Sequence, residues 1–245
     1  MLTKARIKHL QNLKLKKYRQ NYTEFVIEGD KLITEALVEN ADIHLIAATK
    51  TWISDHKYKI PEPIILEEIS EKELEKISSF KTPQSAIALV GIPHSDIKKS
   101  LEKADWILVL DGIHDPGNLG TIIRSADWFG VHTIVCSADC VELYNPKVIQ
   151  ATMGSLFRVQ VFYMDIGEFL QQSGKTVYAA TLNGENIFRI KFEKSGILVI
   201  GSESLGIRPE VLKQCSASIS IPAYGKAESL NAAVATSILL SRIRG

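Results

Sequence analysis

Short apolar runs alternate with helical patterns along most of the chain. Residues 106–110 and 197–200 are continuous apolar runs, which are typical of strands buried on both faces. Between them, residues 119–129 repeat apolar side chains at the spacing of one helix face, and Gly130 follows as an end signal. Further strands are expected at 133–136, 158–162, 177–181 and 217–221, and further helices at 146–152, 166–172 and 230–243. This alternation predicts an α/β fold with a mostly parallel sheet that is covered on both sides.

The first part of the chain follows a similar pattern with shorter segments. Strands are expected at 25–27, 43–48, 63–66 and 86–92, and helices at 30–40 and 71–77. Residues 93–105 are polar and charged, as in a linker with room for one helical turn. The sequence therefore predicts two domains, a small α/β domain over residues 1–95 and a larger one over residues 105–245.

The composition is that of a soluble globular protein. The 245 residues are 45% hydrophobic and 23% charged. No apolar run approaches the roughly 18 residues that a transmembrane helix needs, which argues against a membrane protein. The N-terminal residues lack the apolar core of a secretory signal, so a cytoplasmic location is expected.

The cysteines and histidines give little support to a metal centre. Cys136, Cys140 and Cys215 are an odd number of thiols, which disfavours a disulfide framework. A C-x3-C pair without a second cysteine or histidine pair favours small core residues over a zinc or redox site. The six histidines form no recognisable ligand array, and we expect no metal.

The net charge of +1 conceals an uneven distribution. Residues 1–23 contain seven basic and no acidic side chains, so the remainder of the chain sums to −6. Apolar residues in this segment roughly follow helical spacing, which would leave the basic side chains on the solvent side. Three interpretations are compatible with this pattern: a solvated helix face, an arm that contacts nucleic-acid phosphates, and a membrane-surface helix.

Three polar, glycine-containing loops follow predicted strands, at residues 111–124, 201–210 and 221–235. None contains G-x-G-x-x-G, G-K-[ST] or G-x-S-x-G, which disfavours dinucleotide redox enzymes, P-loop hydrolases and serine hydrolases. Gly201 would allow a ligand to approach the backbone, and Ser229 is a plausible N-cap of the last helix. Arg124, close to Asn118 near a helix start, suits phosphate or ribose binding.

The three loops resemble the three signature motifs of the SpoU (TrmH-like) class of SPOUT RNA 2′-O-ribose methyltransferases. The first motif corresponds to residues 118–120 with Arg124, and the second to residues 201–206. The third corresponds to residues 221–222, 228–231 and 234–235. The N-terminal part is similar to the L30e-like substrate-binding domain of that family.

The resemblance implies a trefoil knot in the C-terminal domain and S-adenosylmethionine as the cofactor. The positions that match cofactor-contacting residues of the family are Gly201, Ile221, Leu230, Thr181, Leu182 and Asn183. The positions that match its active-site residues are Asn118, Arg124, Glu203, Ser229 and Asn231. Arginine is a poor base because its pKa exceeds about 12, so Arg124 could instead fix a phosphate and stabilise the forming alkoxide.

The resemblance also implies a reaction and partners. The expected reaction is methyl transfer to a ribose 2′-hydroxyl in structured RNA, with ribosomal RNA favoured over transfer RNA, and the enzyme is expected to be a homodimer. Two alternatives from other classes remain at this point. One is a non-catalytic RNA-binding protein that retains the fold, and the other is a different α/β enzyme that binds a nucleotide at the same strand ends.

Overall fold

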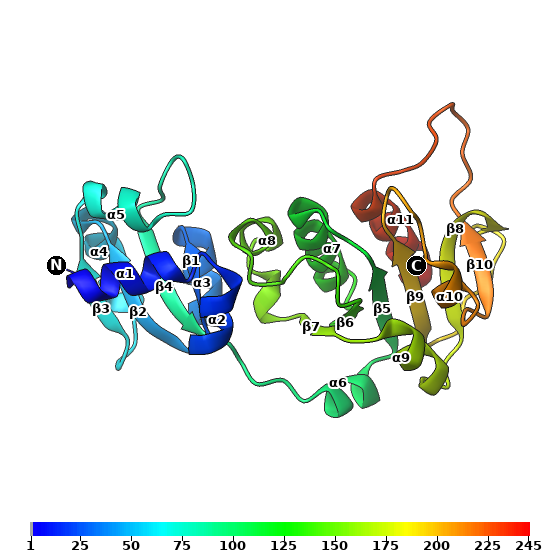
Figure 1. The fold of residues 1–245 in the computed structure, drawn as a ribbon, viewed down its shortest axis with the longest axis horizontal. Coiled ribbons are helices and arrows are strands. Elements are labelled where there is room, and N and C mark those ends of the chain that lie inside the picture. Colours follow the sequence, from blue (N-terminus) through cyan, green and yellow to red (C-terminus); the bar gives the residue numbers. More distant parts are fainter. Residues whose placement is uncertain (1) are drawn as a thin grey trace. The chain divides into compact units, whose positions relative to one another are not determined.

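A computed structural model describes residues 2–245, which form two compact units (Figure 1). The first unit contains the residues up to His94 together with Tyr144–Phe157. The second contains Ser95–Leu143 and Arg158–Gly245. Residues 144–157 were expected in the C-terminal domain, and the domain ranges 1–95 and 105–245 themselves stay a prediction.

The first unit is built on a four-stranded sheet with the order β1-β4-β2-β3. Strand β4 is antiparallel to both β1 and β2, whereas β3 is parallel to β2. The strands are β1 (Glu24–Glu28), β2 (Ile43–Ala48), β3 (Ile65–Glu68) and β4 (Ala86–Gly91). The helices are α1 (Lys4–Asn12), α2 (Lys16–Tyr22), α3 (Asp30–Val38), α4 (Lys50–His56), α5 (Glu71–Ile77) and α8 (Pro146–Thr152), with short 3₁₀ turns at Lys57–Lys59 and Ser155–Phe157.

The basic N-terminal segment forms two helices that belong to the packed unit. Leu10 and Leu13 are buried in a core cluster with residues of α5 and the sheet. The expectation that the basic side chains all face solvent is wrong for Arg19, which is only 3% exposed. Its guanidinium donates a hydrogen bond of 2.8 Å to the Leu13 carbonyl. The break between α1 and α2 leaves this carbonyl in need of a donor, which explains why a cation is buried there.

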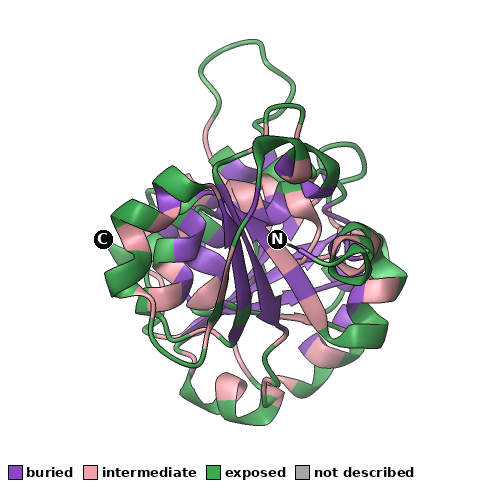
Figure 2. Ribbon diagram, turned by 90° about the vertical axis from the view of Figure 1, so that its left-hand side faces the viewer, coloured by how far each residue is buried: buried purple, intermediate pink, exposed green. Residues whose placement is uncertain are grey.

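The second unit contains a six-stranded sheet with the order β10-β8-β9-β5-β6-β7. Every pairing in this sheet is parallel, which confirms the predicted parallel α/β architecture. The strands are β5 (Trp106–Asp111), β6 (Thr133–Cys136), β7 (Gln160–Tyr163), β8 (Val177–Asn186), β9 (Gly196–Gly201) and β10 (Ala217–Ser220). The central strands β5 and β9 are buried along nearly their whole length, as their continuous apolar runs predicted. In Figure 2, strands are largely purple, whereas the helices have exposed faces in green.

Helices cover both faces of this sheet. On one face, apolar side chains of β5 and β9 pack against α6 (Ile97–Lys103), α9 (Ile166–Gln172) and α10 (Pro209–Leu212). The alternate side chains of those strands point to the other face, where α7 (Pro116–Trp128) and α11 (Ala232–Arg244) lie side by side (Figure 1). Among residues 2–245, no helix has the length and apolar character needed to cross a bilayer.

Two local expectations about the C-terminal part need correction. The N-cap of α11 is Asn231 rather than Ser229, because the Asn231 Oδ1 accepts hydrogen bonds from the backbone N–H groups of Ala233 and Val234 at 2.9 and 3.3 Å. Strand β8 continues five residues past the expected end at residue 181. It does so beside β10, and a Cβ at Gly184 would overlap the Ile219 backbone, so only glycine permits this close approach.

Candidate active site

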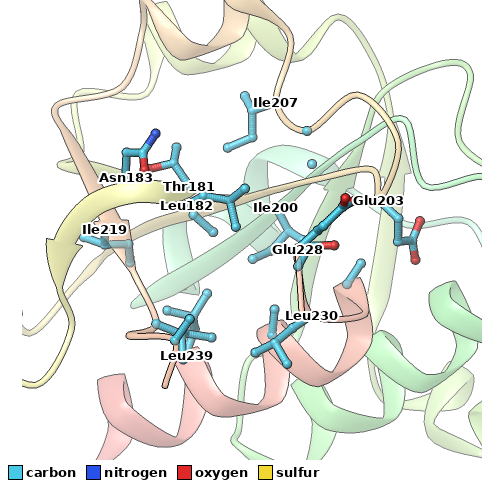
Figure 3. A pocket seen from close by; sticks show the side chains of 18 of the residues that line it. Thr181, Leu182, Asn183, Ile200, Glu203, Ile207, Ile219, Glu228, Leu230 and Leu239 are labelled. Atoms are coloured by element: carbon cyan, nitrogen blue, oxygen red, sulfur yellow. The ribbon is translucent and has the colours of Figure 1, made fainter. Parts of the chain in front are cut away.

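A cavity of about 860 Å³ lies where the strands of the second unit end (Figure 3). Because the sheet is parallel, the carboxyl ends of β8, β9 and β10 lie at the same edge, where α/β proteins bind their ligands. The cavity is enclosed by the loops that follow these strands and by the first turns of α11. The predicted second and third motif loops therefore meet at one place.

All six residues that were predicted to contact a cofactor line this cavity. They are Thr181, Leu182, Asn183, Gly201, Ile221 and Leu230. In Figure 3, the first three lie together along β8, and Leu230 lies near α11 with Leu239. The lining is largely apolar, and Leu182 and Leu230 are 72% and 45% exposed, so they offer hydrophobic contact area to a ligand.

The loop after β9 is a tight turn that depends on glycine. The backbone N–H of Ser202 donates to the Gly206 carbonyl, and that of Gly206 donates to the Ser202 carbonyl, at 3.2 and 2.9 Å. A Cβ at Gly201 would overlap the backbone of Gly206, and Gly206 itself has a φ of +66°. The Gly residues of the second motif are therefore required by the fold of the loop that forms one wall of the cavity.

Polar side chains from all three motifs form one hydrogen-bonded chain. Asn118, near the start of α7, donates through Nδ2 to Glu203 Oε1. Asn231, at the start of α11, donates through Nδ2 to Asn118 Oδ1 at 2.8 Å. Glu203 also lines the cavity, as does Ser229. The structure thus joins three of the five predicted active-site residues by hydrogen bonds beside the cavity, and a fourth, Ser229, lines the cavity.

Arg124 stands apart from this group. It lies on α7, six residues beyond Asn118, and its side chain is exposed. Among residues 2–245, Arg124 has no hydrogen-bond or ion-pair partner, and it does not line the cavity. Six residues along a helix correspond to about 600° of rotation, so the Arg124 side chain projects about 120° around the helix from that of Asn118.

The sequence did not reveal an ion pair that holds the second motif loop in place. Asp111, at the end of β5, is 1% exposed. Its two carboxylate oxygens accept hydrogen bonds from the Arg208 backbone N–H at 2.8 Å and from the Arg208 guanidinium at 2.7 Å. The hydrogen bond with Asp111 raises the pKa of Arg208. An acidic residue directly after a buried strand was the available signal, but its partner is 97 positions away.

The cavity has a negative electrostatic character. Glu203 and Glu228 are its charged lining residues, and no basic side chain of the described chain is among them. Two carboxylates in a partly dehydrated cavity favour a cationic ligand over a neutral one. The sulfonium group of S-adenosylmethionine is such a cation, and the apolar lining suits its adenine ring.

Two buried cysteines support the first motif loop. Cys140 Sγ accepts a hydrogen bond of 3.2 Å from the Ile113 backbone N–H. Hydrogen bonds from Cys136 and Ser137 lower the pKa of Cys140 to about 6, and the same interaction with Cys140 raises the pKa of Cys136. No group of His, Cys, Asp and Glu within residues 2–245 is arranged to hold a metal ion.

Comparison with known proteins gives matches over nearly the whole chain. Residues 105–241 match the SpoU rRNA Methylase family, and residues 4–88 match the MRM3-like substrate binding domain. The 23S rRNA (guanosine(2553)-2′-O)-methyltransferase RlmP of Bacillus subtilis (strain 168) is 31% identical over 245 residues, which cover 98% of this chain and 96% of that protein.

Solved structures are similar over both units. A TrmH-family structure from Porphyromonas gingivalis has a TM-score of 0.88 and 34% identity, and covers 100% of this chain and 98% of that one. The AdoMet-bound rRNA methyltransferase from Sinorhizobium meliloti has a TM-score of 0.86 and 28% identity, and covers 100% of this chain and 95% of that one.

Proposed function

Because the chain belongs to the SpoU rRNA methylase family, we propose that it transfers a methyl group from S-adenosylmethionine to a ribose 2′-hydroxyl in structured RNA. Ribosomal RNA is the favoured substrate, since the Bacillus subtilis relative modifies 23S rRNA. One observation supports this proposal most: the Asn231–Asn118–Glu203 chain of hydrogen bonds joins three loops far apart in sequence beside a cavity suited to the cofactor. The trefoil knot stays a prediction.

The cofactor would occupy the 860 Å³ cavity, which we call the cofactor cavity. Leu182, Ile221 and Leu230 would contact its adenine, and the backbone at Gly201 would lie close to it. When bound, S-adenosylmethionine supplies a methyl group that its positive sulfur already activates for transfer. The carboxylates of Glu203 and Glu228 would stabilise that charge.

The polar side chains from the three motif loops would hold the ribose beside the cofactor cavity. An alcohol attacks slowly unless its proton is removed or its developing negative charge is stabilised. Asn118, Asn231 and Ser229 would orient the hydroxyl and the neighbouring phosphate. Arg124 would bind a substrate phosphate and stabilise the forming alkoxide, since a guanidinium is a poor general base, and the hydroxyl proton would leave to water or to the neighbouring phosphate.

The proposal also includes a contact with a second copy of the chain and a contact with RNA. Trp128 on α7 and Val234 on α11 are 83% and 47% exposed, an apolar surface suited to a second copy of the chain. In the first unit, exposed lysines of α1 and α2 would contact RNA phosphates. An RNA-modifying enzyme of this kind would act in the cytoplasm.

The Arg124→Ala variant tests the proposed function. We expect it to lose at least 100-fold in the rate of transfer of labelled methyl groups to unmodified 23S rRNA. S-adenosylmethionine binding, measured by calorimetry, should stay within twofold, because Arg124 does not line the cavity. Lys103→Ala, which removes an exposed cation on α6, is the matched control and should retain full activity.

Other outcomes would contradict the proposal in different ways. Near-normal turnover of the Arg124→Ala variant would remove Arg124 from the mechanism. If the unaltered chain binds RNA but not S-adenosylmethionine, it is a non-catalytic RNA-binding protein instead.

A further inference from the structure

A hollow on the second unit shares no lining residue with the cofactor cavity. It has a volume of about 410 Å³ and is lined by residues 188–192 and 242–245. Four of these residues are basic, namely Arg189, Lys191, Arg242 and Arg244, and none of the lining side chains is acidic. We call it the basic hollow. Residues 24–245 as a whole sum to −6, so these four cations are gathered in a part of the chain that is acidic overall.

Two of the four cations build the hollow. Arg242 donates to the carbonyls of Ile187 and Ile190 at 3.1 and 3.0 Å, which fixes the segment that follows β8. Arg244 donates to the carbonyls of Phe129 and Gly130 at 2.9 and 2.8 Å. Their guanidinium groups retain further N–H donors and full positive charge, because a carbonyl does not neutralise them.

The other two cations have no partner in the described chain. Arg189 and Lys191 are exposed, and neither side chain forms a hydrogen bond or ion pair with any of residues 2–245. Positive side chains that line one hollow attract an anion to it. Phe188, which also lines the hollow, is 59% exposed and offers an aromatic face beside the cations.

We propose that the basic hollow binds phosphate groups of the RNA substrate, and that a base next to them stacks on Phe188. This inference rests on the proposed function, which supplies RNA as the polyanion. Free arginine and lysine side chains bind successive phosphates, and guanidinium groups can do so with two hydrogen bonds. Exposed aromatic rings next to such cations are the usual stacking platforms for unpaired bases.

The double variant Arg189→Glu with Lys191→Glu tests this assignment. Both side chains are free of internal hydrogen bonds and ion pairs, so the fold should be retained. Lys98→Glu with Lys99→Glu is the matched control, because it changes two exposed lysines on α6 by the same total charge. The probes are a fluorescein-labelled 12-nucleotide oligouridylate and an unmodified 23S rRNA transcript.

We expect the basic-hollow variant to bind both RNA probes at least tenfold more weakly than the control variant. The slope of log Kd against log salt concentration should fall by about 0.7 for each phosphate that the variant no longer neutralises, or about 1.4 for two. S-adenosylmethionine affinity should stay within twofold. Phe188→Ala should weaken oligouridylate binding several-fold without changing the salt slope, since stacking involves no ion release.

Three results would overturn the proposal. The first is an equal effect of the two double variants on RNA binding, which would reflect net charge alone. The second is unchanged RNA affinity of the basic-hollow variant. The third is tight binding of inorganic pyrophosphate that RNA does not displace, which would identify a small-anion site.

A separate measurement distinguishes failure of this inference from failure of the proposed function. If the unaltered enzyme methylates rRNA but the variants behave alike, only the basic hollow is misassigned. If the basic-hollow variant loses RNA binding but the unaltered chain transfers no methyl group to any RNA, the hollow stands and the proposed function fails.

Discussion

The cofactor cavity and the basic hollow belong to the same unit but have opposite character. The cofactor cavity is largely apolar, and its charged lining residues are the carboxylates Glu203 and Glu228. The basic hollow is smaller and lined by four cations. A chain with a net charge of +1 can thus offer one site to a cationic cofactor and another to a polyanion. The distribution of charge, rather than its sum, indicates the partners.

The two sites also differ in how they are held. The wall of the cofactor cavity depends on a glycine turn and on the ion pair between the buried Asp111 and the partly exposed Arg208. The basic hollow is instead held by the hydrogen bonds that Arg242 donates to backbone carbonyls. A substitution in the residues that hold one site should therefore weaken binding at that site and leave binding at the other site unchanged.

The largest effect is expected for Gly201→Val. Its side chain would overlap the Gly206 backbone and displace the loop that forms the cavity wall. Calorimetry should show a loss of S-adenosylmethionine affinity of more than 100-fold, while oligouridylate binding stays within threefold. Loss of both S-adenosylmethionine binding and oligouridylate binding in a folded variant would show that the two sites are not independent.

A smaller effect is expected for Arg208→Ala. Removing the guanidinium leaves the buried Asp111 carboxylate without its counter-ion, which should lower the free energy of unfolding by about 3 kcal/mol. Urea unfolding followed by circular dichroism measures this change. The comparison variant is Arg242→Ala, which should weaken RNA binding more than cofactor binding. If Arg242→Ala weakened cofactor binding more than RNA binding, Arg242 would not be the residue that holds the basic hollow.

Glu228→Gln should change the charge preference of the cofactor cavity. The neutral product S-adenosylhomocysteine lacks the sulfonium charge, so only the cofactor gains from the carboxylate. We expect cofactor affinity to fall about three- to tenfold and product affinity to stay within twofold, because one carboxylate in a partly solvated cavity contributes about 1 kcal/mol. Equal weakening of both ligands would show that Glu228 acts by shape.

The salt concentration should affect the affinity for RNA strongly and the affinity for the cofactor only slightly. Raising the salt concentration from 50 to 200 mM should weaken RNA binding about tenfold or more, because bound counterions are released from phosphates. The same change should alter cofactor affinity less than twofold. A strong salt dependence of cofactor binding would contradict the proposed apolar character of that site.

The sequence predicted most of the second unit because its strands are simple to recognise. Residues 106–110 and 197–200 are apolar throughout, since both faces of β5 and β9 are covered. The loops after such strands must meet at one edge of a parallel sheet, so motifs scattered over the sequence predicted one cavity. The assignment of Gly201, Ile221 and the other motif residues to catalytic or cofactor roles stays a prediction.

Features that depend on a single side-chain contact were not predictable. Helix α4 buries only Trp52, so its sequence has no apolar periodicity. Asn231 rather than Ser229 caps α11, and both residue types are good caps. The burial of Arg19 and the Asp111–Arg208 pair depend on the tertiary fold, which brings distant partners together.

The central position of β5 has a consequence for synthesis of the chain on the ribosome. Its neighbour β6 follows soon after, but its other neighbour β9 pairs Gly196 with Trp106 and is made much later. Until then, one edge of the apolar strand β5 is open to other chains, which is a hazard for aggregation. A nascent chain that pauses before Gly201 should therefore need chaperone protection, and release from it should coincide with completion of the central strand pair.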